Sequence, residues 1–310
     1  MEKKWIHNIN KPIKAGALCL GAFDGIHIGH KALIARVLKQ ASPASGLGLS
    51  FSPHPREFFY SKNPKDFKPF QRILPEETNA SLMESEGLEA LYFVEFNEEL
   101  SQKNTNEFLD YIKNFIDFSA LVVGFDFRLG NQRKGGQEDI KFWCDKNKVE
   151  FVSVDKITDN SKKVSSTLVR EALRDNNFKK AEALLGHSYY LEGLPVKDQG
   201  LGGKLGFPTM NIKLPKNLVL RNGVYSAVVQ IDTKLYHSVV NLGQRPTVEK
   251  NADTKTLEVH ILENDFEGSK GPLKVVFKGF IRSELKFESL TDLSLQVQKD
   301  ILECKAFFKL

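Results

Sequence analysis

Two histidines in a glycine-bearing stretch have the spacing of a phosphate-binding site. His27 and His30 close the segment from Gly21 to His30, which follows apolar residues 17–20 and precedes apolar side chains at helical spacing. We expect a strand-to-helix turn, where the free N–H groups of the helix N-terminus favour an anion. The histidines add two side-chain donors. A lone histidine is more often an ordinary loop or core residue, but this pair favours a functional site.

Two further polar stretches in the first half could contact a nucleotide. Residues 121–130 end an apolar strand in a loop that carries Asp126 and Arg128, which can touch a ribose or a phosphate. Taken alone, a solvated loop is the better explanation of that stretch. Residues 165–167 supply two serines and a threonine before Arg170. They would serve as an ordinary helix N-cap, but beside the histidine pair we favour a site for a triphosphate.

The second half carries a glycine-dense loop and an isolated acidic strand residue. Residues 200–206 lead to Thr209 and Asn211, whose oxygens suit Mg²⁺ with a nucleotide, because Mg²⁺ keeps waters and takes few protein ligands. The simpler interpretation is a flexible hairpin loop. Glu258 alternates with apolar neighbours, so it shares a strand face with His260. A solvent-facing glutamate on a barrel strand is the common alternative.

The first part of the chain alternates short apolar runs with helical patterns. Repeated β-α-β units predict an α/β fold with a doubly wound, Rossmann-like parallel sheet, whose ligands bind at the carboxyl ends of the strands. The expected strands are residues 17–20, 46–51, 91–96, 120–124 and 150–154. The expected helices are residues 31–41, 75–85, 105–115, 137–147, 166–174 and 178–185.

The pattern changes near residue 186, where short strands separated by turn signals begin. These predict a small antiparallel β-barrel with a terminal helix over residues 290–308 on its outside. The expected strands are residues 189–196, 208–213, 223–232, 235–242, 255–263 and 273–282. We therefore expect two domains, residues 1–185 and 186–310.

Composition and charge limit the kinds of partner and the cellular compartment that we expect. The net charge of +5 and the pI near 8.9 are modest for 310 residues and suit small anionic ligands without demanding nucleic acid. The three cysteines are odd in number and widely spaced, which favours a reducing compartment over a disulfide framework. No signal peptide or membrane-spanning run is seen, so a cytoplasmic protein without a membrane partner is expected. Whether it forms a homo-oligomer is left open.

An ordered set of motifs resembles the prokaryotic bifunctional riboflavin kinase/FAD synthetase family over nearly the whole chain. In the first half, F-D-G-x-H-x-G-H matches residues 23–30, P-H-P matches 53–55, G-x-D-F matches 124–127 and S-S-T-x-x-R matches 165–170. In the second half, L-G-F-P-T-x-N matches residues 205–211, G-V-Y matches 223–225 and N-x-G-x-x-P-T matches 241–247. The first motif alone fits several nucleotidyltransferases, whereas the ordered set is highly specific.

The resemblance implies two reactions that use ATP as co-substrate and Mg²⁺. The C-terminal domain would phosphorylate riboflavin to FMN, and the N-terminal domain would transfer AMP to FMN, giving FAD and pyrophosphate. The implied adenylyltransferase residues for ATP are Gly21, Phe23, Asp24, Gly25, His27, His30, Ser165, Ser166, Thr167 and Arg170, with the two histidines catalytic, and those for FMN are Pro53, His54 and Asp126. The implied kinase residues are Gly202, Gly206, Pro208, Thr209 and Asn211 for ATP, the last two also for the metal, Arg282 and Phe287 for flavin, and Glu258 as the catalytic base.

Three other functions fit part of this pattern. The chain could be a different small-molecule adenylyltransferase whose barrel only regulates it. It could be an RNA-binding protein, since His-x-Gly-His also occurs in class I aminoacyl-tRNA synthetases and small barrels bind oligonucleotides, although a dense basic surface signal is lacking. It could also sense nucleotides without turnover.

Overall fold

The computed structural model describes residues 3–159, 162–196, 206–243, 254–263, 266 and 268–310. The chain forms two compact units, Met1–Phe70 with Glu76–Ser166, and Gln71–Pro75 with Thr167–Leu310. The predicted boundary at residues 185 and 186 differs from this packing division, because helices over residues 166–185 pack with the second unit.

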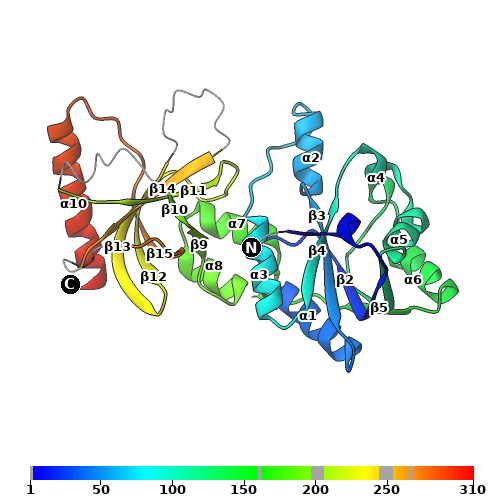
Figure 1. The fold of residues 1–310 in the computed structure, drawn as a ribbon. Helices are drawn as coiled ribbons and strands as arrows, with labels where there is room; N and C mark the ends of the chain where they lie inside the picture. Colours follow the sequence, from blue (N-terminus) through cyan, green and yellow to red (C-terminus); the bar gives the residue numbers. More distant parts are fainter. Residues whose placement is uncertain (1–2, 160–161, 197–205, 244–253, 264–265, 267) are drawn as a thin grey trace. The chain divides into compact units, whose positions relative to one another are not determined.

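The first unit is built on a six-stranded parallel sheet in the order β1-β4-β3-β2-β5-β6 (Figure 1). Its strands are β1 (Lys4–Trp5), β2 (Ile13–Leu20), β3 (Gly46–Ser52), β4 (Ala90–Glu95), β5 (Ile116–Gly124) and β6 (Glu150–Val154). The chain runs from β2 outward through β3 to β4 and then returns to add β5 on the other side of β2. The strand order therefore reverses between β2 and β5, which is where doubly wound sheets bind ligands.

Helices cover both faces of this sheet, as the doubly wound prediction requires. The helices of this unit are α1 (Ile28–Ala41), α2 (Pro55–Lys62), α3 (Glu76–Ser85), α4 (Glu98–Gln102), α5 (Thr105–Lys113) and α6 (Gln137–Lys146), of which α1 and α3 pack on one face and α5 and α6 on the other. Alternate residues of β2 enter two separate cores: Ala17 and Cys19 pack with α1 and α3, whereas Leu18 and Leu20 pack with α5 and α6. Both faces of the strand are thus buried, which explains its continuous apolar run.

Several short elements of the first unit escaped the sequence patterns. They are β1, the 3₁₀ helices η1 (Ile6–Asn8) and η2 (Asn131–Arg133), α2, α4, and the hairpin strands β7 (Thr158–Asp159) and β8 (Lys162–Lys163). Helix α2 matters most for function, because it begins at the second proline of the P-H-P motif. Eight residues with little apolar periodicity gave no signal beyond that tolerated first-turn proline.

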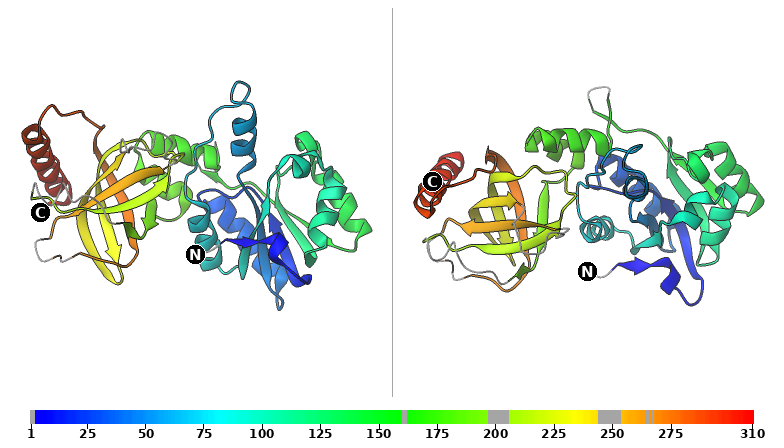
Figure 2. Two further views of the ribbon diagram at one scale, coloured as in Figure 1. Left: turned by 45° about the horizontal axis from the view of Figure 1, so that its top comes forward. Right: turned by 90° about the horizontal axis from the view of Figure 1, so that it is seen from above.

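The second unit contains helices α7 (Ser166–Arg174) and α8 (Phe178–Leu185) and a nearly closed antiparallel barrel (Figure 2). The sheet order is β10-β11-β14-β13-β12-β15-β9. The strands are β9 (Tyr190–Gly193), β10 (Pro195–Val196), β11 (Met210–Pro215), β12 (Gly223–Ile231), β13 (Lys234–Gly243), β14 (Thr254–Ile261) and β15 (Leu273–Arg282). The Phe178 ring of α8 stacks on Phe277 of β15 at 6.0 Å, so α8 packs on the barrel.

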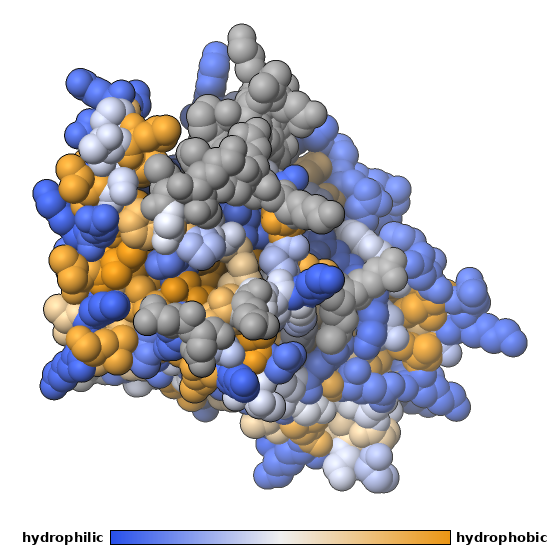
Figure 3. Space-filling model, turned by 60° about the vertical axis from the view of Figure 1, so that its left-hand side comes forward, coloured by the Kyte–Doolittle hydropathy of each residue, from blue (hydrophilic) through white to orange (hydrophobic). Residues whose placement is uncertain are grey.

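The terminal helix α10 (Leu290–Phe308) lies on the outside of the barrel, as expected from the sequence. One side of the helix buries Cys304 with Val224 and Val239 of the barrel. The other side exposes apolar residues, with Leu295 at 53% and Leu302 at 67% exposure. Figure 3 brings this part of the molecule forward and shows apolar surface gathered there. Within the described residues, no helix is both long and apolar enough to cross a membrane.

Candidate active sites

His27 and His30 lie together at the start of α1, on the turn that follows β2. His27 is the N-cap of the helix, and its Nδ1 accepts a hydrogen bond from the backbone N–H of His30 at 3.3 Å. The two rings stack with centroids 3.7 Å apart, and Phe23 meets His30 edge to face at 5.2 Å. The turn lies between a strand and a helix, as expected. The two imidazole rings lie together at the N-terminus of that helix.

Glycine permits the shape of this turn at two positions. Gly25 has a φ of +85°, which disfavours a side chain. A Cβ on Gly29 would lie 3.1 Å from the His27 ring, a tight contact that the ring would have to relieve by a small shift. The motif glycines therefore serve the placement of the histidine as well as the bend of the chain.

Two long-range contacts hold the turn in place, and of their residues sequence reasoning missed only Asn79. The side-chain oxygen of Asn79 on α3 accepts a hydrogen bond from the Gly25 N–H at 2.7 Å. The Ser166 hydroxyl donates to the carbonyl of buried Asp24 at 3.0 Å. A single buried asparagine inside a helix has no sequence signature, so Asn79 was missed. Ser166, expected at the ATP site, does lie beside the histidine turn.

The loop after β5 contributes Asp126, which is paired with Lys163 of β8. The Lys163 ammonium also lies 4.8 Å from the centroid of the Phe125 ring. Burial, the neighbouring His27 and the Lys163 charge together hold the pKa of His30 well below its ordinary value. His30 is therefore neutral near pH 7 and offers one N–H donor to a phosphate oxygen. Lys163 was not anticipated, because a lone lysine in a short hairpin has no pattern.

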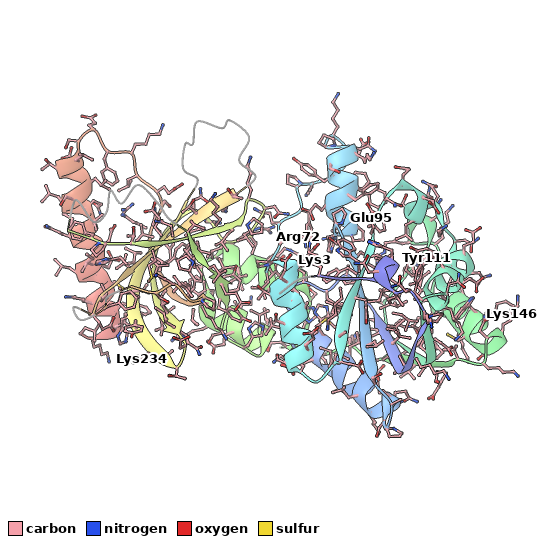
Figure 4. All side chains as sticks on the ribbon, in the orientation of Figure 1. Lys3, Arg72, Glu95, Tyr111, Lys146 and Lys234 are labelled. Carbon is pink, nitrogen blue, oxygen red and sulfur yellow. The ribbon has the colours of Figure 1, made fainter. Side chains whose placement is uncertain are left out.

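The P-H-P segment joins β3 to α2 and is packed from both ends. His54 is the N-cap of α2, where its Nδ1 accepts from the Arg56 N–H at 3.1 Å, and its ring stacks on Phe70 at 4.0 Å. At the end of β3, the Ser52 hydroxyl donates to buried Glu76 at 2.6 Å, and Lys3, labelled in Figure 4, pairs with the same carboxylate at 2.5 Å. His54 thus has a structural role besides the expected contact with FMN.

Arg170 is buried on α7 in the second unit, about one helical turn after the Ser-Ser-Thr segment. Its Nε donates to the backbone carbonyl of Gln71 at 2.7 Å, and the side-chain oxygen of Gln71 accepts from Nε and Nη2 of Arg174 at 3.1 and 2.9 Å. Both arginines of α7 are thereby oriented by one glutamine from the short segment Gln71–Pro75. The compact units divide between Ser166 and Thr167, so the expected ATP residues of this motif fall in both units.

In the barrel, the expected catalytic residue lies in a lateral row across the sheet. Glu258 of β14 is directly opposite Asn211 of β11 on one side and Asn241 of β13 on the other. Asn241 is opposite Val224 of β12, which is opposite Arg282 of β15. Directly opposite residues of antiparallel strands share a face. The row therefore brings Asn211, Glu258 and Arg282 to one face, as their proposed joint function requires.

Arg282 is held at the end of this row by the terminal helix. Its Nε and Nη2 donate to the two carboxylate oxygens of buried Asp300 at 2.8 and 2.7 Å, and Gln296 donates to the same carboxylate at 2.9 Å. The guanidinium carbon lies 5.9 Å from the centroid of the Phe287 ring. The two residues expected at the flavin end are thus neighbours, while Asp300 and Gln296 were not anticipated.

The nucleotide-loop residues are only partly described. Gly202 lies outside the described residues. Gly206 has a φ of +85°, and Pro208 and Thr209 precede β11, which begins at Met210 and not at the expected residue 208. His260 lies on the face of Glu258, as expected, and its Nδ1 donates to the Pro208 carbonyl at 2.9 Å. That contact ties the end of the loop to the strand that carries Glu258.

Comparison with known proteins covers both halves of the chain. The family model for FAD synthetase matches residues 10–168, and the family model for riboflavin kinase matches residues 185–308. The chain is 32% identical over 308 residues to a bifunctional riboflavin kinase/FMN adenylyltransferase of Bacillus subtilis, covering 97% of this chain and 95% of the relative. The corresponding protein of Haemophilus influenzae is 30% identical over 98% of this chain and 97% of its own.

One solved structure is similar over nearly the whole chain. A crystal structure described as a macrolide-efflux protein from Streptococcus pneumoniae superposes with a TM-score of 0.73 at 29% identity, covering 96% of this chain and 95% of that one. The similarity supports the fold of both halves.

Proposed function

Because the chain belongs to the bifunctional riboflavin kinase/FMN adenylyltransferase family, with an FAD synthetase domain followed by a riboflavin kinase domain, we propose how its own residues divide the two reactions. The C-terminal domain phosphorylates riboflavin to FMN, and the N-terminal domain transfers AMP from ATP to FMN with release of pyrophosphate. We place the functional boundary at residues 185 and 186, which fits the start of the riboflavin kinase match at residue 185.

The adenylyl step takes place at the histidine turn. The FMN phosphate attacks the α-phosphorus and pyrophosphate leaves, so the protein has to position both groups and neutralise the charge that develops. His27 and His30 hold the α-phosphate at the N-terminus of α1, within the turn of Gly21, Phe23, Asp24 and Gly25. Ser165, Ser166, Thr167 and Arg170 hold the leaving phosphates. Pro53, His54 and Asp126 contact FMN at the strand ends on either side of β2.

The kinase step takes place on the row of residues around Glu258. Glu258 removes the proton of the terminal ribityl hydroxyl as that oxygen attacks the γ-phosphorus, and ADP leaves. Gly202, Gly206 and Pro208 contact ATP, and Arg282 and Phe287 contact the flavin.

A magnesium ion fits Thr209 and Asn211, at the β11 end of the row. Thr209 offers a hydroxyl and buried Asn211 offers an amide oxygen opposite Glu258, which is the hard oxygen donor set that Mg²⁺ prefers. Among the described residues, no group of three histidine, cysteine or acidic side chains could hold a metal by itself. The metal, when bound, supplies charge neutralisation for the phosphates, while Glu258 keeps the proton transfer.

We also place the protein in the cytoplasm. All three cysteines, Cys19, Cys144 and Cys304, are buried free thiols, which suits a reducing compartment. The partners are riboflavin, FMN, FAD and ATP, with no role for nucleic acid or a membrane. Whether the protein forms a homo-oligomer is left open.

The two-site proposal rests on one observation: the candidate catalytic residues for the two reactions lie in different compact units. The histidine pair lies within one compact unit and the Glu258 row lies within the other. The test is to incubate the purified chain with riboflavin and Mg-ATP and to separate the flavins by chromatography. FMN should appear first and FAD afterwards, whereas supplied FMN should give FAD directly. Absence of both products would overturn the proposal.

A further inference from the structure

Two motif glycines of the second half make room for the same piece of chain, residues 282–284 at the end of β15. A Cβ on Gly223, the glycine of G-V-Y, would lie 2.5 Å from the carbonyl oxygen of Arg282. A Cβ on Gly243, the glycine of N-x-G-x-x-P-T, would lie 2.1 Å from Oε1 of Glu284. Both glycines therefore allow this piece of chain to lie against the first residue of β12 and the last residue of β13.

The carboxylate of Glu284 contacts the end of the barrel through both of its oxygens. Oε2 accepts a hydrogen bond from Nδ2 of Asn222, which directly precedes β12, at 2.9 Å. Oε1 lies against the backbone of Gly243. Burial lowers the pKa of Lys255 on β14, and the charge of Glu284 opposes that shift, so the two charged groups are neighbours. One carboxylate thus connects residues 282–284 to the same end of three strands.

The turn that carries Asn222 is itself held in place. The hydroxyl of Tyr225, the buried tyrosine of G-V-Y, donates to the carbonyl of Arg221 at 2.6 Å. The residues just before and just after Asn222 are therefore fixed, by this bond and by the close approach of Gly223 to β15. The amide that binds Glu284 stands on a rigid piece of backbone.

Glu284 lies in the sequence between the two residues expected to contact the flavin. The guanidinium carbon of Arg282 is 5.9 Å from the centroid of the Phe287 ring, so these residues form one surface. Arg282 is bound by Asp300 of α10, and its Nη1 donates to the Ser283 carbonyl at 2.9 Å. These bonds fix the start of the segment to the terminal helix, whereas Glu284 fixes it to the barrel strands.

We propose, given the riboflavin kinase activity of the barrel, that Glu284 is a positioning residue for the flavin. Its carboxylate holds residues 282–287 against the barrel, so that the guanidinium of Arg282 and the ring of Phe287 are in place before riboflavin binds. A segment that is already ordered loses less conformational entropy when the ligand arrives. The role should therefore be seen in the KM for riboflavin, while kcat and the KM for ATP stay the same.

The test is FMN formation by the full chain, with riboflavin and ATP varied separately. Glu284→Ala should raise the KM for riboflavin by about twofold to tenfold, the equivalent of one net hydrogen bond. Asn222→Ala, which removes the donor, should raise it by a similar factor. Glu284→Gln should keep most of the wild-type KM, because its side-chain oxygen still accepts from Asn222.

A double-mutant cycle tests whether Gly243 acts through the carboxylate. Gly243→Ala should raise the KM for riboflavin as Glu284→Ala does, because the new methyl group displaces the end of a flexible side chain. In a Glu284→Ala background, the same substitution should add little, since the displaced group is already absent. Glu288→Ala, an exposed acidic residue just after Phe287, is the matched control and should leave all three kinetic constants unchanged.

Each result against the proposal has a distinct meaning. A normal riboflavin KM in both Glu284→Ala and Asn222→Ala would overturn the positioning role and leave the kinase activity in place. An equal rise in the KM for ATP, or a loss of kcat, would show a general loss of barrel structure, which also overturns it. Full additivity of Gly243→Ala and Glu284→Ala would contradict the shared contact. Absence of FMN with the wild-type chain would overturn the proposed function itself, and the positioning role with it.

Discussion

The two candidate sites are assembled in opposite ways. The adenylyl site is concentrated in one continuous turn, residues 21–30, where a strand ends and α1 begins. The proposed kinase site is spread along a row over five strands, from Asn211 through Glu258 to Arg282. A turn can present backbone N–H groups and two histidines to one phosphate. In the proposed kinase site, a row instead would separate a metal end, a base and a flavin end by the spacing of strands.

This contrast gives different sensitivities. Loss of one group from the turn removes charge stabilisation from the adenylyl step only. Loss of one group from the row is expected to affect the kinase step only, and Arg282 depends in addition on its hold by Asp300 of α10.

Replacing both His27 and His30 with alanine should abolish FAD formation from supplied FMN. Each substitution removes a side chain that stabilises charge in the transition state. One such group typically contributes about 10²–10³ in rate. Riboflavin phosphorylation should stay near normal, since it depends on the other compact unit. Separate assays of the two products check this, and equal loss of both activities in a folded protein would contradict the two-site comparison.

Glu258→Gln should lower the FMN-forming rate by on the order of 10²–10⁴, the usual range for losing a general base. The substitution keeps the shape, so ATP binding to the barrel should persist, and FAD formation from FMN should not change. Glu192→Gln on β9 is a matched control that should leave the rate unaltered. A normal rate for Glu258→Gln would return that residue to an ordinary strand position.

Asp300→Asn should destabilise the barrel by about 3 kcal/mol, because it leaves the Arg282 guanidinium without its bidentate partner. The KM for riboflavin should rise as well, since Arg282 is expected at the flavin end. Denaturant unfolding measures the first effect and initial rates the second. The exposed pair of Lys113 with Asp117 is the control, where Asp117→Asn should cost less than about 1 kcal/mol.

Arg170→Ala should raise the KM for ATP in the adenylyl reaction by about tenfold, as expected for losing a hydrogen bond from a charged group. Arg174→Ala is the matched control: it lies on the same helix and contacts the same Gln71, but it is outside the motif. Unchanged ATP kinetics in Arg170→Ala would leave Arg170 as a structural residue bound to the Gln71 carbonyl.

Lowering the pH should reduce the free energy of unfolding of the first unit through the protonation of His30. Its folded-state pKa is lowered from the ordinary value of 6.5 by burial and by the charges of His27 and Lys163. The unfolded chain therefore binds a proton more readily, so the contribution is present above about pH 6.5 and is lost as the pH falls below it. Unfolding curves at several pH values should show this slope, and His30→Gln should reduce it. If the pH dependence of unfolding is the same in His30→Gln, other titrating groups cause it.

The sequence by itself determined the elements and the order of the motifs. Helix α8 was placed from Phe178 to Leu185, because its ends are set locally by the Asn177 N-cap and by Gly186 in the left-handed region. Helix α1 ends at Ala41 as expected but begins at Ile28, three residues before the expected residue 31, because His27 is its N-cap. Helix α2 was missed, since its eight residues carry little periodicity. Local capping and periodicity extend over a few residues, so they can be recognised without a structure.

Only the tertiary structure decided which distant residues meet. Asn79 contacts Gly25 across 54 residues, Arg170 contacts Gln71 across 99, and Ser166 contacts Asp24 across 142. The place of Asn241 beside Glu258 and the hold of Asp300 on Arg282 depend on strand register and on where α10 packs. Those contacts follow from the burial of apolar faces on many elements at once. No short stretch of sequence contains that information, which is why the turn was recognisable and the supports of both sites were not.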